Sequence, residues 1–331
     1  MPKLLCAPMA TLSHEAFRRT IEKFGGCDEY FTEMINAPSL LNMGPFEKYY
    51  LMDGPVPEKI VWQLTGTSSS PLAKAASLLS LKNGIGIDLN MGCSAPQIYK
   101  TGAGIAWMLK PLDETREMVR AVKDALNETE VKTGIHKRLS VKCRLGNDDF
   151  TDESFFSFTD MLFEEGVEAV TLHPRTLKEK LRGWPRWEYA EKLSLRYPGM
   201  KINVNGEITD AKSAKKAMEK APHADGLMIG RMAAQKPWIF STLKQEFSES
   251  PEDERKPVDA EQVALDYIDL VEEFQPPEFH RTRLQRFFSY YCKTFTFGHY
   301  FQTQMLNYHS VEECREKVRD YFAKVPDDRF Q

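Results

Sequence analysis

The chain has 331 residues, of which 42% are hydrophobic and 28% are charged, and its formal net charge is −4. This composition is typical of a globular protein, and the small negative charge gives no overall attraction to nucleic acid, so an RNA-binding surface would have to be local. No apolar run approaches the roughly 20 residues of a membrane-spanning helix, and the start is too interrupted by proline for a secretory signal, so we expect a cytoplasmic protein.

Short apolar runs alternate with amphipathic stretches from the N-terminus to about residue 245. The predicted strands are Leu4–Ala7, Glu29–Thr32, Ile60–Leu64, Ile85–Asn90, Leu139–Arg144, Ala169–His173, Lys201–Asn205 and Gly226–Ile229. The predicted helices are Ser13–Lys23, Pro71–Leu81, Leu112–Leu126, Asp152–Glu165, Trp187–Arg196, Asp210–Lys220 and one that begins at Pro237. Strands that alternate with helices pair in parallel through crossover helices, and about eight such units make a (βα)8 TIM barrel.

An open, doubly wound sheet is the alternative fold for this alternation. That fold carries G-x-G-x-x-G after its first strand, whereas this chain has Ala7-Pro8-Met9-Ala10 at that place. We therefore predict a barrel catalytic domain over residues 1–247.

The C-terminal part of the chain lacks strand signals. Residues 248–257 are polar, charged and bounded by proline, which indicates a linker. Asp259 can cap a helix with one apolar face, and Ser310 begins a capping box before a second helix. The sequence therefore predicts a small helical bundle over residues 258–331.

The chain has six cysteines, and none falls in a C-x-x-C pair, so we expect reduced thiols and no metal site. Five of them fit the role of small buried residues. Cys93 differs, because it lies just beyond a predicted strand and Gly92 allows a sharp turn before it. An ordinary thiol is largely protonated at neutral pH, which suits a general acid better than a nucleophile. The sequence places no histidine near Cys93 to activate it, although a partner in space remains open.

Polar residues follow successive predicted strands, where a barrel carries its reactive groups. Asn205-Gly206-Glu207 and Ile229-Gly230-Arg231 follow the last two strands, where this fold commonly binds phosphate. Glycine lets backbone N–H groups approach an anion, and Arg231 adds a forked positive charge. Ordinary tight turns are the alternative interpretation of these two loops.

Lys142 is predicted to point into the barrel mouth. An ammonium there could stabilise the negative charge on N1 and C2=O of a reduced flavin, or it could form a Schiff base as in barrel aldolases. Gln63 and His173 offer hydrogen-bond donors to the polar edge of a flavin, and an aldolase gives these two residues no such shared purpose.

Taken in order, the strand-end segments resemble those of the FMN-dependent tRNA-dihydrouridine synthases. The matching segments are Ala7-Pro8-Met9, Thr32-Glu33-Met34, Val61 to Gly66, Asp88 to Cys93 with Lys100 to Gly104, Val141 to Arg144, His173 to Thr176, Asn205 to Ile208 and Ile229-Gly230-Arg231. They span the whole predicted barrel. Several also occur singly in other flavin barrels, but the Asn-x-Gly-Cys segment with the ordered remainder is specific.

The resemblance implies an enzyme in which NADPH reduces FMN, hydride passes from the flavin to C6 of a uridine in tRNA, and Cys93 protonates C5. It implies that Asn90 and Arg175 face the substrate base. The residues that it assigns to FMN are Pro8, Met9, Gln63, Lys142, His173, Asn205, Glu207, Gly230 and Arg231. The chain departs from the family pattern at Ser94, Pro174 and Glu207, and these departures leave open which uridine is the target.

The C-terminal region also fits an RNA partner. Within residues 279–297, taken as a helix, one apolar stripe is formed by Leu284, Phe287, Phe288, Tyr291 and Phe295, and a basic stripe beside Tyr290 by Arg283, Arg286 and Lys293. A second basic group, Lys178, Lys180, Arg182 and Arg186, lies in the loop after the sixth predicted strand. Basic faces at both places suit phosphate contacts, and an ordinary solvated face is the alternative.

The main alternative function is a flavin barrel oxidoreductase that acts on a free small molecule, such as a pyrimidine or an enone. A non-catalytic RNA-binding barrel and a Lys142 aldolase are further alternatives. The sequence indicates no obligate protein partner, and an enzyme of this size can act as a monomer.

Overall fold

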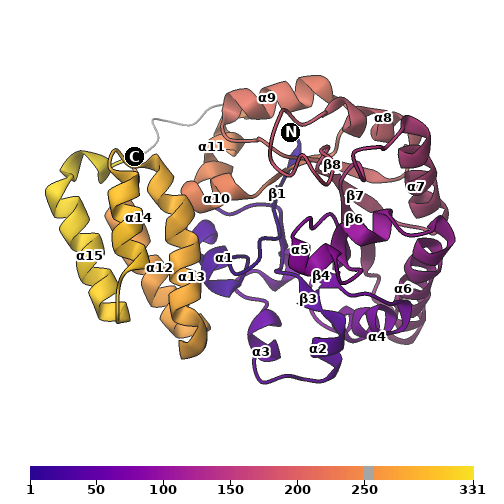
Figure 1. The fold of residues 1–331 in the computed structure, drawn as a ribbon, viewed down its shortest axis with the longest axis horizontal. Helices are drawn as coiled ribbons and strands as arrows, with labels where there is room; N and C mark the ends of the chain where they lie inside the picture. The colour runs from indigo at the N-terminus through magenta and orange to yellow at the C-terminus, as the bar shows by residue number, and fades with distance from the viewer. Residues whose placement is uncertain (249–256) are drawn as a thin grey trace.

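The computed structural model of the chain describes residues 1–248 and 257–331. Its centre is a closed barrel of parallel strands: β1 (Lys3–Cys6), β2 (Glu29–Phe31), β4 (Ile60–Thr65), β5 (Gly86–Met91), β6 (Arg138–Cys143), β7 (Ala169–Leu172), β8 (Lys201–Asn205) and β9 (Gly226–Ile229). The strands are ordered β2-β1-β9-β8-β7-β6-β5-β4, and pairing of β2 with β4 closes the sheet (Figure 1). The predicted TIM barrel is therefore confirmed.

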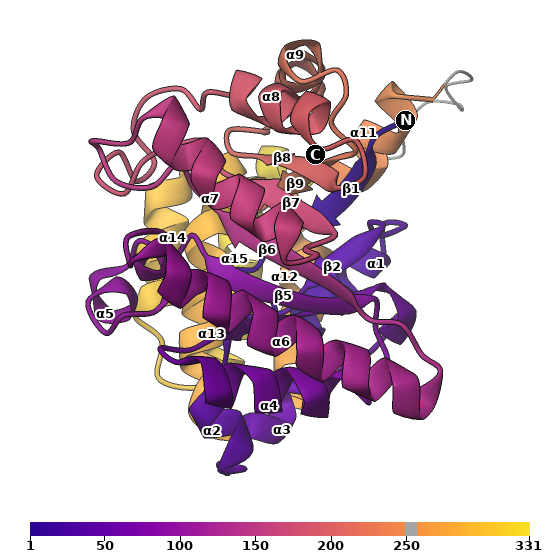
Figure 2. The same cartoon turned by 90° about the vertical axis from the view of Figure 1, so that its right-hand side faces the viewer.

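Helices cover the outside of the barrel, and Figure 2 shows α4, α6 and α7 lying along one side of it. The crossover helices are α1 (Glu15–Glu22), α4 (Ser69–Ser80), α6 (Leu112–Thr133), α7 (Asp152–Glu164), α8 (Glu188–Arg196), α9 (Ala211–Lys220) and α11 (Ile239–Glu246). Shorter elements are β3 (Ile35–Asn36), α2 (Ala37–Leu41), α3 (Glu47–Tyr50), α5 (Pro96–Tyr99), α10 (Arg231–Gln235) and 3-10 turns at Pro57–Lys59 and Gly104–Met108.

The apolar runs form strands because their apolar side chains are covered either inside the barrel or by the helices. Every residue of β4 and of β5 is buried. Two local predictions were wrong. Helix α6 continues beyond Leu126 to Thr133, where Gly134 adopts φ 71° and ends it. Between β2 and β4, where no helix was predicted, the chain forms β3, α2 and α3.

The C-terminal helices are α12 (Ala260–Phe274), α13 (Pro277–Tyr291), α14 (Gly298–Leu306) and α15 (Val311–Lys324), with 3-10 turns at Cys292–Thr294 and Pro326–Asp328. They pack side by side next to the barrel, with α12 against α1 and α13 against α10 (Figure 1). The predicted linker at 248–257 falls almost wholly on residues outside those described. None of the described helices combines the length and apolar character needed to cross a membrane.

The apolar stripe predicted within 279–297 is confirmed as the core of this helical unit. All five of its members are buried, and the Phe287 ring stacks on Tyr267 of α12 with centroids 3.8 Å apart. The segment is not one helix, however. It breaks after Tyr291 and resumes at Gly298, where an added Cβ would lie 2.1 Å from the carbonyl oxygen of Cys292. A glycine is required at that close approach.

A buried ion pair joins the C-terminal helices to the barrel. The Arg283 guanidinium of α13 contacts Glu33, which follows β2, at 2.8 Å, and both side chains are less than one-tenth exposed. Glu33 also accepts a hydrogen bond from the backbone N–H of Thr11 at 2.6 Å. The prediction that Arg283 belongs to an exposed basic stripe was therefore wrong: it faces the barrel because Glu33 lies opposite.

Replacing Arg283 with alanine should lower the free energy of unfolding by about 3–5 kcal/mol, because the Glu33 carboxylate would remain buried without its partner. Denaturant unfolding at neutral pH measures the loss. Lys324→Ala is the control, because Lys324 makes an exposed pair with Asp320, and the loss of such a pair should change stability little.

The stability lost in Arg283→Ala should also depend on pH. Burial already raises the pKa of Glu33, against the opposing effect of Arg283. Without Arg283 this pKa would rise further, so folded protein would bind a proton that the unfolded chain, with a glutamate pKa of about 4.3, has released. The destabilisation relative to wild type should thus grow as the pH rises above the pKa that Glu33 has beside Arg283 in the folded wild-type protein. An equal loss at pH 5 and pH 8 would contradict this account.

Candidate active site

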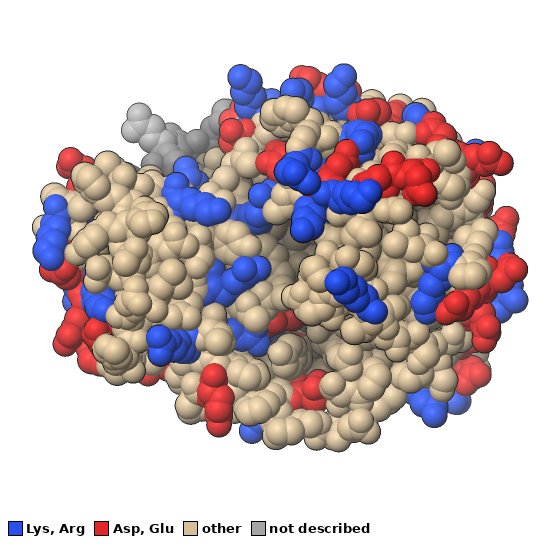
Figure 3. All heavy atoms as spheres, in the orientation of Figure 1, with Lys and Arg blue, Asp and Glu red and all other residues tan. Residues whose placement is uncertain are grey.

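A cavity of about 440 Å³ opens at the carboxyl ends of β1, β6, β7, β8 and β9. Its volume lies in the range of small-molecule and cofactor sites, about 300–1,000 Å³. Helix α13 supplies part of its wall through Arg286 and Tyr290. Figure 3 shows a hollow between the C-terminal helices and the barrel, with lysine and arginine side chains around it.

Eight of the nine residues predicted to bind a cofactor line this cavity. They are Pro8, Met9, Lys142, His173, Asn205, Glu207, Gly230 and Arg231. The ninth, Gln63, is fully buried and does not line it. The cavity also contains residues that sequence reasoning did not assign to the site: Ile208 ends a recognised segment, Thr209 directly follows it, and Gln235 lies four residues beyond another.

Lys142, on β6, projects its charge into this cavity. Burial lowers the pKa of its ammonium to about 8, with a further lowering by Arg144 and an opposing effect of Asp88. Among the described residues, the ammonium has no hydrogen-bonding or ion-pairing partner. A desolvated cation without a protein partner favours an anion or a strong acceptor as its ligand.

The loop after β8 holds two arginines through one carboxylate. Glu207 has φ 53°, a left-handed conformation that is uncommon outside glycine. Its Oε1 accepts a hydrogen bond from Arg231 at 2.6 Å and one from Arg175 at 3.1 Å. The strained backbone thus presents a carboxylate that orients Arg231, which lines the cavity, and Arg175, which does not.

The tautomer of His173 is fixed by Arg175. Guanidinium nitrogens only donate, so the 3.0 Å contact with Nε2 of His173 makes that nitrogen an acceptor and leaves the ring proton on Nδ1. Burial lowers the pKa of His173 well below its ordinary value, and Arg144 and Lys142 lower it further. The ring is therefore neutral near pH 7 and carries one N–H to donate.

Arg175 itself is only 1% exposed. Besides His173 and Glu207, its guanidinium donates to the carbonyl of Gly183. The predicted contact of Arg175 with a substrate base stays a prediction, and the contacts seen here are all within the protein.

Cys93 lies in the loop after β5 and is half-buried, whereas the other five cysteines are buried. Its backbone N–H donates to Oδ1 of Asn90 at 3.0 Å, and Arg144 donates to the carbonyl of Gly92 at 2.9 Å. The carbonyl of Cys93 accepts from the N–H of Ile105 at 3.2 Å. The loop is therefore held on both sides of Cys93, and Arg144 connects it to the cavity that Arg144 lines.

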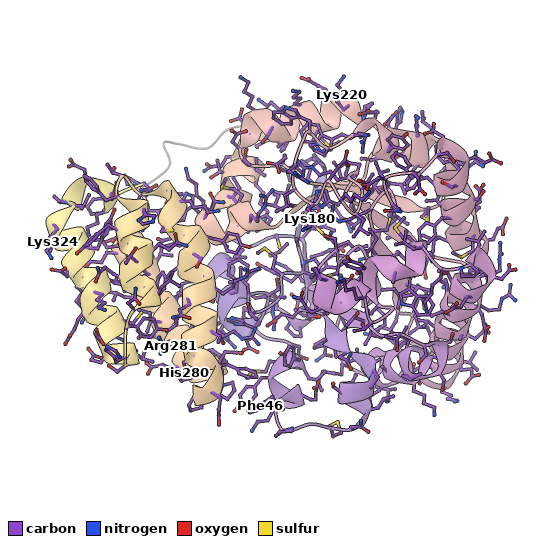
Figure 4. The ribbon with its side chains drawn as sticks, in the orientation of Figure 1. Phe46, Lys180, Lys220, His280, Arg281 and Lys324 are labelled. Carbon is purple, nitrogen blue, oxygen red and sulfur yellow. The ribbon has the colours of Figure 1, made fainter. Side chains whose placement is uncertain are left out.

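The predicted basic loop after β7 is only half available for a ligand. Lys178 pairs with Asp148, and Arg186 pairs with Glu179. Among the described residues, Lys180 and Arg182 pair with no carboxylate. Figure 4 places Lys180 near the centre of the view, between the C-terminal helices and the outer barrel helices.

Of the basic stripe predicted within residues 279–297, two members, Arg286 and Lys293, lie beside the ring of Tyr290. The Arg286 guanidinium lies 5.1 Å from the Tyr290 ring centroid and the Lys293 ammonium 5.5 Å from it. Because Tyr290 and Arg286 line the cavity, this cluster forms its outer edge.

The fold and the site together define a βα-barrel enzyme with a cofactor-sized cavity that is lined by several cations. The chain belongs to the dihydrouridine synthase family, whose model matches residues 5–325. A probable tRNA-dihydrouridine synthase from Aquifex aeolicus is 29% identical over 249 residues, which cover 73% of each chain. One from Staphylococcus aureus (strain COL) is 26% identical over 336 residues, which cover 99% of this chain and 95% of that protein.

Among solved structures, morphinone reductase in complex with tetrahydroNAD matches with a TM-score of 0.50 and 11% sequence identity. The match covers 76% of this chain and 88% of that chain. At this identity the likeness concerns the barrel fold alone.

Gly206 provides a sharp test of the cavity wall. It has φ +108°, and an added Cβ would lie 2.8 Å from Cδ2 of His173. Gly206→Ala should therefore lower the free energy of unfolding by about 2–5 kcal/mol, the sum of left-handed strain and overpacking. The control is Gly134→Ala, where φ is +71° but no atom lies within 4 Å, so that strain alone costs about 1–2 kcal/mol. Equal losses in urea unfolding would mean that His173 does not fill this space.

Proposed function

We propose that the protein is an FMN-dependent tRNA-dihydrouridine synthase that uses NADPH as reductant and Cys93 as general acid. The observation that carries this proposal is the connection of the Cys93 loop to the cation-lined cavity through Arg144, which lines the cavity and holds the Gly92 carbonyl. A scaffold without catalysis would not need a half-buried thiol on a loop fixed so closely to a cofactor-sized cavity.

The cavity fits FMN in charge and shape. Gly230, Arg231 and the loop from Asn205 suit the phosphate, because glycine lets the backbone approach an anion and the guanidinium supplies paired donors. Pro8 and Met9 offer an apolar surface to the ring system. When bound, reduced FMN supplies the hydride that goes to C6 of uracil.

Lys142 and His173 would act on the flavin edge in different ways. The partnerless ammonium of Lys142 stabilises negative charge there electrostatically. Neutral His173, with its proton on Nδ1, offers a hydrogen-bond donor without adding a second charge. Gln63 is assigned to the flavin by the family resemblance, but in this structure its amide is bonded to Asp88 and Asn90.

Cys93 would donate its thiol proton to C5 of uracil as hydride arrives at C6. The uracil gains two hydrogens, and the thiolate left on Cys93 recovers a proton from solvent. Asn90 has one amide hydrogen bonded to Gln63 and keeps the other for the substrate base.

We assign RNA contact to the C-terminal helical unit together with the loop after β7. Arg286 lines the cavity, Lys293 lies over the cavity-lining Tyr290, and Lys180 and Arg182 flank the cavity-lining Leu181. None of these four cations has a carboxylate partner among the described residues. Tyr290 offers a ring on which a base could stack. Because one chain supplies both walls of the cavity, a monomer suffices, and we place the enzyme in the cytoplasm with its tRNA substrate.

The first test is incubation of purified protein with NADPH and unmodified tRNA, followed by mass spectrometry of nucleosides and fragments. We expect a gain of two hydrogens at a uridine. Flavin that is bound and reduced by NADPH, without such a gain, would favour a small-molecule oxidoreductase. Absence of flavin would remove the cofactor assignment.

Cys93→Ala should remain yellow and flavin-bound but form product about 10²–10⁴-fold more slowly, the usual worth of a general acid. Single-turnover mixing of NADPH-reduced enzyme with tRNA measures this rate. Ser94→Ala is the matched control in the same loop. Near-wild-type turnover by Cys93→Ala would rule out the assigned role.

Arg286→Ala and Lys293→Ala should each weaken tRNA binding and reduce the slope of log K against log salt by about 0.7–0.9, the effect of one phosphate contact. Lys324→Ala, on α15 at the far edge of Figure 4, should leave the slope unchanged. These point variants are preferable to deleting residues 258–331, because α13 forms a cavity wall for any substrate. An unchanged slope in both variants would place the RNA elsewhere.

A further inference from the structure

A chain of buried hydrogen bonds runs through the barrel interior to the backbone of Cys93. Asp88 accepts from Ser140 at 2.7 Å and from Nε2 of Gln63 at 2.8 Å. Oε1 of Gln63 accepts from Nδ2 of Asn90 at 2.9 Å, and Oδ1 of Asn90 accepts from the N–H of Cys93 at 3.0 Å. The participating side chains come from three neighbouring strands, β4, β5 and β6.

We propose that Asp88 is a positioning residue that sets the orientation of the Gln63 and Asn90 amides and thereby holds the backbone of the proton donor Cys93. This inference rests on the proposed function for the role of Cys93, but the hydrogen-bond relay can be tested without it.

The direction of the relay follows from the chemistry of its buried end. An ionised carboxylate only accepts hydrogen bonds, so Gln63 must turn its NH2 group toward Asp88 and its carbonyl toward Asn90. Asn90 must then turn its own NH2 group toward Gln63, which leaves its carbonyl facing the loop. With the amides reversed, the NH2 group of Asn90 would meet the N–H groups of Gly92 and Cys93.

Asp88 is suited to this role because it is completely buried and fully occupied. Burial raises its pKa to about 6, with hydrogen bonds from Gln63 and Ser140 opposing the rise, so it is mainly ionised above neutral pH. Both of its oxygens are engaged by donors of the protein. It lies behind Gln63 and does not line the cavity, so it acts through its neighbours and not on a ligand.

The relay controls one end of a peptide plane whose other end is fixed independently. Asn90 binds the Cys93 N–H, and Arg144 binds the Gly92 carbonyl of the same peptide. The plane between Gly92 and Cys93 is therefore clamped at both ends, which fixes the direction in which the Cys93 side chain leaves the backbone. Displacement of a catalytic group by about 1 Å can cost roughly 10²-fold in rate.

Residue-resolved hydrogen exchange of the Cys93 amide tests the relay in the whole protein. Asp88→Leu removes the acceptor, and Gln63→Met breaks the next link with little change in volume, so one variant remains if the other fails to fold. Each should speed exchange at Cys93 about 3- to 10-fold, the worth of one ordinary hydrogen bond. Asp88→Asn keeps an oxygen for Gln63 and should restore slow exchange. Ser140→Ala, which removes a donor from the other oxygen of Asp88 and leaves the bond to Gln63 in place, is the control.

A kinetic comparison then separates positioning of Cys93 from general disruption. Asp88→Leu should slow reduction of tRNA by the reduced enzyme about 10- to 100-fold, while NADPH reduces the flavin at the wild-type rate. In a Cys93→Ala background, the same substitution should cause no further loss. Equal losses in both backgrounds would overturn the proposal.

The outcomes also distinguish failure of the relay from failure of the proposed function. Unchanged exchange at Cys93 in both Asp88→Leu and Gln63→Met overturns the relay, whatever the enzyme does with tRNA. Wild-type protein that forms no dihydrouridine overturns the proposed function, and faster exchange in the two variants would still support the relay.

Discussion

Closure of the barrel by the β2–β4 pairing is the constraint on which the site depends. A closed parallel sheet has no free edge, so its strand interiors can be almost wholly buried, and polar groups that must reach a ligand are confined to the rim at the carboxyl ends. That is why residues as distant in sequence as Met9, Lys142 and Arg231 line one cavity. Asp88 and Gln63 are among the exceptions: they lie deeper, and their side-chain polar atoms are bonded to each other or to close neighbours.

The cavity is strongly positive because polar and charged groups from several strands are confined to the same rim. Lys142, Arg144, Arg231 and Arg286 line it, and Glu207 is the one carboxylate among its lining residues in the described chain. Burial lowers the pKa of Lys142 to about 8 and, with the charge of Arg175 nearby, that of Arg144 to about 10. The charged form of each residue is thus less stable than it would be in water, and a bound anion would replace the stabilisation that hydration provides there. Burial, together with these nearby cations, lowers the pKa of His173 and keeps its ring neutral.

The barrel fold and most of the polar residues at its rim could be predicted from the sequence, because both depend on local signals. Apolar periodicity marks each strand, and the strand-end motifs then converge through the topology. Sequence reasoning missed what depends on partners across space. The sequence alone indicates that Arg283 belongs to a basic stripe, whereas in the structure it pairs with Glu33. In the same way, Lys178 and Arg186 were predicted to be available to a ligand, but they pair with Asp148 and Glu179. Gln63 and Asn90 were both identified as functional, but their contact with each other and with Asp88 could be recognised only after the strands were aligned.

The attachment of the C-terminal helices links the stability of the fold to its function. Arg283 and Tyr290 are seven residues apart on α13 and so lie on the same side of the helix, with Arg286 close to that side. The buried pair of Arg283 with Glu33 therefore sets the rotation of α13 about its own axis, and this rotation directs Tyr290 and Arg286 to the cavity. Glu33 also binds the Thr11 N–H, two residues beyond Met9, which lines the same cavity. One buried carboxylate thus fixes two walls of the site, and this coupling gives a physical reason for keeping an ion pair where apolar packing could have joined the same surfaces.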